Sequence, residues 1–278
     1  MERFLGVFAS DHRRLACAVA RAWTGFPPSD PAFRGRMGLG TYGGDEVLLM
    51  RRPVGPDVQG DAWIGPAPGN HALFAMDDTQ QIRFTPETTA PWRYRNLLGV
   101  FALGAVPDPG FGDRVRTMIP EFMAREARNE PPEALAFRLV LSVLHDMGRL
   151  DARTIPSDSL AEALRTAIRM WPRASGEDGA PVPGMAACVT DGRSLVAGAT
   201  GLPLYVWPSD SIPDCARCSE PARSKDHDPI RVRHDDLRMV VVAGGDVEPW
   251  NPGFRPLADG AVAVVDETGA FRVRSPVS

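Results

Sequence analysis

The chain opens with Met1-Glu2-Arg3-Phe4-Leu5-Gly6-Val7-Phe8, and this stretch decides the fold. Its apolar run predicts a short strand over residues 3–8. No signal peptide is expected here, because the stretch lacks a basic region, an apolar segment and a small-residue cleavage site. A strand at this position suits a chain whose first residues belong inside a folded core.

The composition is that of a globular protein with a sizeable core. The chain has 278 residues, 44% of them hydrophobic, which suffices for one large domain or two small ones. Its net charge of −4 gives no support for a nucleic-acid or anionic-membrane partner. No apolar run reaches the roughly 18 residues of a membrane span. We therefore expect a cytoplasmic protein with no nucleic-acid and no membrane partner.

The regular elements follow one another in the order strands, helices, strands. Apolar spacing predicts helices at residues 13–23, 112–127, 132–147 and 157–171, the last with a capping box of Ser159 and Glu162. Short apolar runs predict strands at residues 3–8, 38–42, 46–50, 72–75, 81–84, 97–106, 185–189, 194–199, 204–207, 238–243, 261–265 and 271–273. Because the order is not βαβ, it favours an α+β fold with two mostly antiparallel sheets between helical layers.

Segments spread over most of the chain match the pattern of one enzyme family. They are residues 1–6, 38–42, 87–94, 133–135, 190–192 and 262–269. Together they resemble class II glutamine amidotransferases, including the ergothioneine-pathway amidohydrolase type. In this family the first three segments typically read Met-Cys-Arg-Leu-Leu-Gly, Gly-Trp-Gly-Ile-Gly and Glu-Asn-Thr-His-Pro-Phe. The resemblance implies one domain over residues 1–278, folded as the four-layer αββα Ntn-hydrolase sandwich, with a polar insert at about 208–236.

The catalytic groups of that family do not carry over. In the family, removal of the initiator Met exposes a Cys at the N-terminus, and the thiol of this Cys attacks glutamine. In this chain Glu2 stands at that position. A carboxylate is a poor nucleophile toward an amide. Asp77 aligns with the Arg that anchors the α-carboxylate of glutamine. Ala102 and Leu103 fall at the Asn and Gly of the oxyanion hole, where one lost donor costs on the order of 3 kcal/mol. Pro131 replaces the Asp that orients the substrate amine.

Two carboxylates, Glu2 and Asp77, would therefore share the former glutamine pocket. They repel each other, so at least one pKa should rise unless a cation intervenes. We expect Arg3 or Arg93 to supply that cation. Without such a cation, the pocket would prefer a cationic ligand or a divalent ion to glutamine.

The resemblance thus predicts a degenerate amidotransferase-like protein with no confident catalytic residue. It would serve in binding, scaffolding or regulation, with an unidentified small molecule or protein as its partner. Two alternatives stay open. One is an active amidotransferase or amidohydrolase whose nucleophile is a different residue, and the other is a zinc- or redox-responsive module using Cys215 and Cys218. The sequence leaves enzymatic activity undecided and favours its absence.

The chain has too few cysteines for a secreted disulfide framework: Cys17, Cys188, Cys215 and Cys218. Cys215 and Cys218 have the spacing of zinc ligands, and His227 and His234 follow, although their own spacing exceeds the usual three to five residues. The alternatives are structural zinc at these four residues, a redox-sensitive disulfide, or two unlinked loop thiols, and we favour the last, without a cofactor. Cys17 falls among apolar residues and is expected to be buried and inert.

Overall fold

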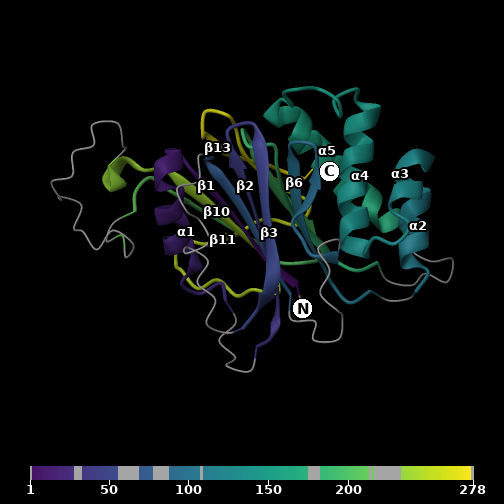
Figure 1. Ribbon diagram of the computed structural model, residues 1–278, viewed down its shortest axis with the longest axis horizontal. Coiled ribbons are helices and arrows are strands. Elements are labelled where there is room, and N and C mark those ends of the chain that lie inside the picture. The colour runs from purple at the N-terminus through teal and green to yellow at the C-terminus, as the bar shows by residue number, and fades with distance from the viewer. Residues whose placement is uncertain are drawn as a thin grey trace.

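The computed structural model describes residues 2–27, 33–55, 69–77, 88–106, 109–174, 182–212, 215 and 233–276. Within these residues two antiparallel sheets face each other between helices (Figure 1). Helix α1 (Leu15–Trp23) packs on the first sheet, and helices α4 (Pro132–Asp146) and α5 (Ser157–Met170) pack on the second. The predicted α+β fold of four layers is confirmed.

The first sheet has the N-terminal strand at its centre. Its strands are β1 (Glu2–Ala9), β2 (Gly35–Gly43), β3 (Glu46–Val54), β4 (His71–Asp77), β9 (Leu204–Ser209), β10 (Met239–Gly245) and β11 (Arg255–Pro256). Their order across the sheet is β11-β9-β10-β1-β4-β2-β3. Strand β1 pairs antiparallel with both β10 and β4, so the strand predicted at residues 3–8 is confirmed.

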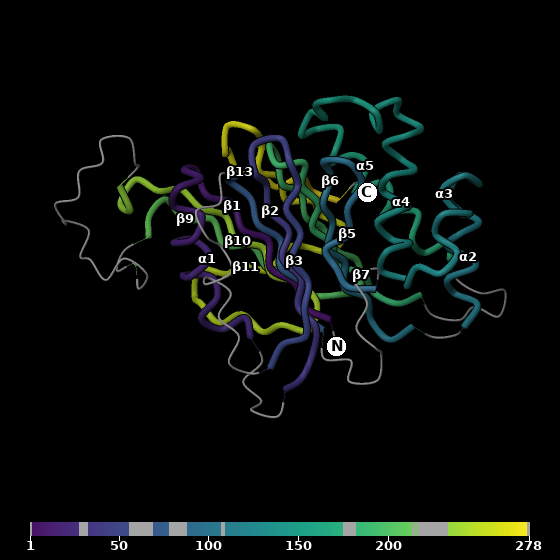
Figure 2. Tube along the Cα trace, in the orientation of Figure 1, coloured from purple at the N-terminus to yellow at the C-terminus, as the bar shows by residue number. Residues whose placement is uncertain are grey.

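The second sheet runs beside the first, as the trace in Figure 2 shows. Its strands are β5 (Trp92–Tyr94), β6 (Leu97–Leu103), β7 (Met185–Thr190), β8 (Leu195–Thr200), β12 (Val262–Val265) and β13 (Phe271–Arg274). Their order is β13-β12-β8-β7-β6-β5. Strands β5 and β11 were not predicted, because two or three residues are too short for a periodic signal. The strand expected at residues 81–84 lies outside the described residues.

Alternate side chains of β1 enter two different cores. Phe4 and Phe8 belong to the core between the two sheets, which continues to α4 and α5. Leu5 and Val7 point the other way, into the core under α1. A Cβ on Gly6 would lie 2.8 Å from Sγ of Cys188, so the sheets approach each other closely at this glycine. The inner face of the first sheet is therefore the face toward the second sheet, and the outer face is the one toward α1.

The helical region departs from the prediction at two places. The helix expected at residues 112–127 is two helices, α2 (Phe111–Thr117) and α3 (Glu121–Glu126), because Pro120 lacks the amide needed to continue the first. The capping box of Ser159 and Glu162 is wrong. Helix α5 starts after Pro156, and Glu162 accepts a hydrogen bond from Arg165 instead. No helix among the described residues is long and apolar enough to cross a bilayer.

Candidate functional site

Charged side chains gather at one end of the inner face of the first sheet. Glu2 at the start of β1 lies directly opposite Asp77 at the end of β4, and Asp77 lies opposite Arg36 on β2. Strand alternation directs all three toward the second sheet, as it does Phe4 and Ala75. Residues directly opposite each other have Cβ atoms roughly 5 Å apart. The two carboxyl groups named from the sequence therefore do share one site.

Arg36 brings a cation to this site. Its guanidinium forms an ion pair with Asp77, and its Nη1 donates a hydrogen bond of 3.2 Å to Oγ1 of Thr88. The side chains of Arg36 and Asp77 are only 8% and 13% exposed, so water screens their attraction less than it would on the surface. The prediction that Arg3 or Arg93 supplies the cation is therefore wrong, and Arg36 is in that place.

The two arginines expected in that role bind elsewhere. Arg3 points to the outer face, where it pairs with Asp246 at 3.7 Å and donates a 3.3 Å hydrogen bond to the backbone oxygen of Phe26. Arg93 donates from Nε to the backbone oxygen of Arg95. Strand alternation explains the first case, because Arg3 follows Glu2 directly and so points away from it.

Glu133, in the first turn of α4, brings a third carboxyl group to the site. Burial, with the negative charges of Glu133 and Asp77, raises the pKa of Glu2 well above its usual value, and Arg36 offsets this only in part. Burial and Asp77 also raise the pKa of Glu133, against its own backbone amide and Arg36. Oε2 of Glu2 is buried without a hydrogen-bond partner among the described residues. Three carboxyl groups thus share one guanidinium, which favours the protonated form of the two glutamates.

Gly245, the last residue of β10, packs between the backbone of Glu2 and the side chain of Ala102. Gly245 has a φ of +85°, a conformation that favours glycine. A Cβ on it would lie 2.2 Å from the backbone oxygen of Glu2 and 2.8 Å from Cβ of Ala102. The buried methyl group of Ala102 therefore lies beside the start of β1, where it offers no hydrogen-bond donor. Position 102 is thus brought to Glu2, as the resemblance implies.

Leu103 and Pro131 supply no polar side chain. Leu103 ends β6 opposite Met185 on β7. Pro131 precedes α4 in an extended conformation, and its ring carries no acceptor for a substrate amine. The carboxyl group contributed by this helix comes instead from Glu133, two residues further on.

Arg36 and Glu133 are the site residues that sequence reasoning missed. Arg36 lies two residues before the glycine-rich segment at 38–42, so strand alternation could have placed it on the same face as Gly38 and Gly40. Its partnership with Asp77 needs the register of β2 on β4, which no local pattern contains. Glu133 carried no signal beyond its place in the helical resemblance.

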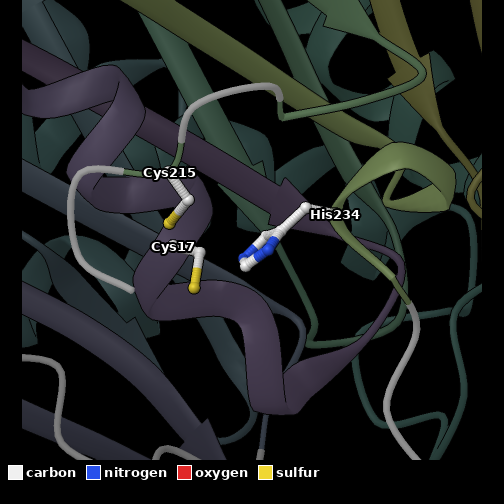
Figure 3. A group of neighbouring side chains, drawn as sticks. All are labelled: Cys17, Cys215 and His234. Carbon is white, nitrogen blue, oxygen red and sulfur yellow. The ribbon is translucent and has the colours of Figure 1, made fainter. Parts of the chain in front are cut away.

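A second group of polar side chains lies in the core under α1. Sγ of Cys17, Sγ of Cys215 and a ring nitrogen of His234 all lie within 4.8 Å of one another, and all three residues are buried (Figure 3). Cys218 and His227, which the sequence offered as two further ligands in the zinc alternative, lie outside the described residues, as does most of the predicted polar insert. The expected burial of Cys17 is confirmed, but it has polar neighbours that the sequence did not reveal.

No protein-family model matches this sequence, and no curated protein matches it. Solved structures do match. A glutamine aminotransferase class-II domain protein from Silicibacter pomeroyi matches with a TM-score of 0.54 and 13% identity, over 99% of this chain and 100% of that one. The glutamine phosphoribosylpyrophosphate amidotransferase of B. subtilis, complexed with ADP and GMP, matches with a TM-score of 0.51 and 10% identity, over 98% of this chain and 48% of that one. The chain therefore has the Ntn-hydrolase fold of class II glutamine amidotransferase domains.

Proposed function

We propose that this protein is a catalytically degenerate relative of the class II glutamine amidotransferases, which uses their fold for binding, scaffolding or regulation. Glu2 carries the proposal. A buried carboxyl group with a raised pKa stands where the family's nucleophilic thiol would be. A carboxylate is already a poor nucleophile toward an amide, and a protonated carboxyl group is poorer still.

The charge of the site supports the same conclusion. The resemblance places a substrate-binding Arg at position 77, whereas Asp77 changes the local formal charge from +1 to −1. The nearby Arg36 is bound to Asp77 and to Thr88. The α-carboxylate of glutamine would thus approach three carboxyl groups and a guanidinium that already has partners.

The transition state would also lack a donor. In the family an Asn amide stabilises the oxyanion, and here the corresponding side chain is the methyl group of Ala102. Loss of one such donor costs on the order of 3 kcal/mol, about a hundredfold in rate. This loss adds to the missing nucleophile and the missing carboxylate anchor.

The described thiols do not favour a different nucleophile. Cys17, Cys188 and Cys215 are all buried, which keeps them from a substrate. Burial also raises the pKa of Cys188, so the reactive thiolate is disfavoured there. The alternative of an active enzyme with another nucleophile therefore gains no support from these residues.

Ammonia release from glutamine tests the proposal. We expect purified protein, with its intact N-terminal mass recorded on the same sample, to retain Met1 and to release ammonia at the buffer rate. The retained Met1 follows from Glu2, since the aminopeptidase that removes Met prefers small second residues. A competent class II amidotransferase assayed in parallel is the positive control. Ammonia above background that an N-terminal blocking reagent abolishes would contradict the proposal.

A further inference from the structure

We propose that Cys17, Cys215 and His234 form a zinc-binding site in the core under α1. Cys17 belongs to α1, Cys215 follows β9, and His234 begins the short helix η5 (His234–Asp236). Figure 3 shows the imidazole ring of His234 directed toward the neighbouring side chains of Cys17 and Cys215. The site lies on the opposite face of the first sheet from Glu2, and it does not depend on the proposed loss of amidotransferase activity.

The distances suit a tetrahedral ion after a small contraction. The three ligand atoms lie within 4.8 Å of one another. Zn–S bonds of about 2.3 Å and Zn–N bonds of about 2.0 Å place the ligand atoms of a tetrahedral site roughly 3.5–3.8 Å apart. Side-chain rotations that bring each atom inward by about half an ångström meet this requirement. Three protein ligands leave the fourth position of a tetrahedral ion to a further donor.

The surroundings favour a neutral, metal-bound state. Cys17, Cys215 and His234 are 4%, 5% and 9% exposed, and Ile212 and Leu237 are fully buried in the same cluster. An imidazolium or an isolated thiolate would be costly in such a core. Two thiolates, a neutral imidazole and Zn²⁺ together carry no net charge, and these are the protonation states in which the ligands bind metal.

The backbone holds the ligands in place before any ion arrives. Cys17 lies within a regular helix, between the buried residues Leu15 and Val19. The N–H of Ile212 donates a 2.8 Å hydrogen bond to the backbone oxygen of His234, which ties the chain before Cys215 to the start of η5. An ion bound here would cross-link α1 to two segments that are distant from it in the sequence. We therefore assign the site a structural role.

The donor set selects the metal class. Thiolate and imidazole together are typical of zinc, whereas calcium and magnesium prefer oxygen ligands. The carboxyl groups around Glu2 are a poorer metal site, because Asp77 among them already forms an ion pair with Arg36. The competing product at the thiols is a Cys17–Cys215 disulfide, which the test below distinguishes.

Metal analysis of untagged, full-length protein tests the site. Protein from zinc-supplemented cells, purified without chelators, should contain about one zinc per chain. The variants Cys17→Ser, Cys215→Ser and His234→Gln should each lower this content at least tenfold. Cys188→Ala, which removes a buried thiol from the core between the sheets, should leave it unchanged. Zinc retained by a Cys17→Ser/Cys215→Ser double variant would overturn the proposal.

Cobalt substitution keeps the test valid if a variant misfolds. Wild-type protein freed of zinc and titrated with Co²⁺ should develop thiolate-to-cobalt charge-transfer bands and the intense visible bands of a tetrahedral site. Alkylation of Cys17 and Cys215 should accelerate when zinc is removed. Folded wild-type protein that binds neither zinc nor cobalt, or that carries a Cys17–Cys215 disulfide as purified, would overturn the proposal.

Discussion

On the inner face of the first sheet, Glu2, Asp77 and Glu133 share the guanidinium of Arg36, while on the outer side Cys17, Cys215 and His234 converge with no carboxylate among them. Both clusters are buried in a largely apolar interior. In the inner cluster the negative charge of Asp77 is paired with the positive charge of Arg36. The outer cluster holds two thiols and an imidazole, side chains that bind zinc as thiolates and as a neutral ring.

This difference separates what the fold supplies from what this chain has added. The family resemblance assigns the nucleophile, the carboxylate anchor and the oxyanion hole to Glu2, Asp77 and Ala102, and we propose that the inner cluster keeps this position in the fold without the family's chemistry. The outer cluster has no counterpart in the resemblance. We propose that the outer face of this sheet binds a metal and that its inner face no longer supports glutamine hydrolysis.

Removal of the shared cation should have the largest effect. Arg36→Met leaves Asp77 buried without its ion-pair partner and should lower the free energy of unfolding by about 3–5 kcal/mol, measured by urea denaturation at pH 7. The double variant Arg36→Met/Asp77→Asn should recover part of the lost free energy of unfolding, because it removes the unpaired charge. The control is Arg125→Met, which removes an exposed pair with Glu121 and should cost less than about 0.5 kcal/mol. Equal losses for the two arginines would show that the inner cluster is not a buried ion pair.

The other end of the inner face should respond to acid. Burial lowers the pKa of His71 from 6.5 to about 4. The unfolded chain therefore binds a proton below about pH 6.5, while the folded chain does not until about pH 4. The free energy of unfolding should fall across this window by about 3 kcal/mol. His71→Gln should lack this component when its pH profile is compared with that of the wild type, and parallel profiles would contradict the assignment.

Neutralising Glu2 should stabilise the protein in base. The folded state holds the Glu2 proton to a higher pH than the unfolded chain does, so the wild type loses stability as pH rises from about 4.5 through the raised pKa. Glu2→Gln avoids this loss. At pH 8 the variant should have a Tm a few degrees above that of the wild type, and the difference should shrink toward pH 4. Glu267→Gln, in an exposed turn, should show no such pH-dependent gain.

Restoring the thiol alone should have the smallest effect of these changes, with no gain in glutaminase activity. Glu2→Cys supplies the nucleophile but leaves Asp77 at the anchor position and Ala102 at the oxyanion position. Groups that act as a unit lose function together, so one returned group has little effect. We expect no burst of ammonia from glutamine in a rapid-mixing assay. A measurable burst would show that the remaining pocket still binds and activates substrate.

The fold was predictable because its signals are local. The apolar runs of β1, β2 and β3 and the apolar spacing of α4 and α5 each lie within one short segment. The helix expected at 112–127 was wrong because of one residue, Pro120, which breaks it. The strands that were missed, β5 and β11, are too short to carry a period.

The sites were only partly predictable, because they are assembled from distant segments. The resemblance brought Glu2, Asp77 and Ala102 to one place, but the partner of Asp77 depends on the register of β2 against β4. Cys17 gave no sign of its neighbours, since its own surroundings in sequence are those of an ordinary buried helix residue. Contacts between elements, rather than patterns within them, decide both clusters.

The titration of Glu2 tests the central claim most directly. In protein labelled with ¹³C at the glutamate side-chain carboxyl groups, the resonance that disappears in Glu2→Gln belongs to Glu2. We predict that this resonance titrates well above the usual glutamate range, because burial, Glu133 and Asp77 all disfavour its charged form. An ordinary glutamate titration would show that Glu2 faces water, and it would contradict the account of a catalytic position converted into a buried acid cluster.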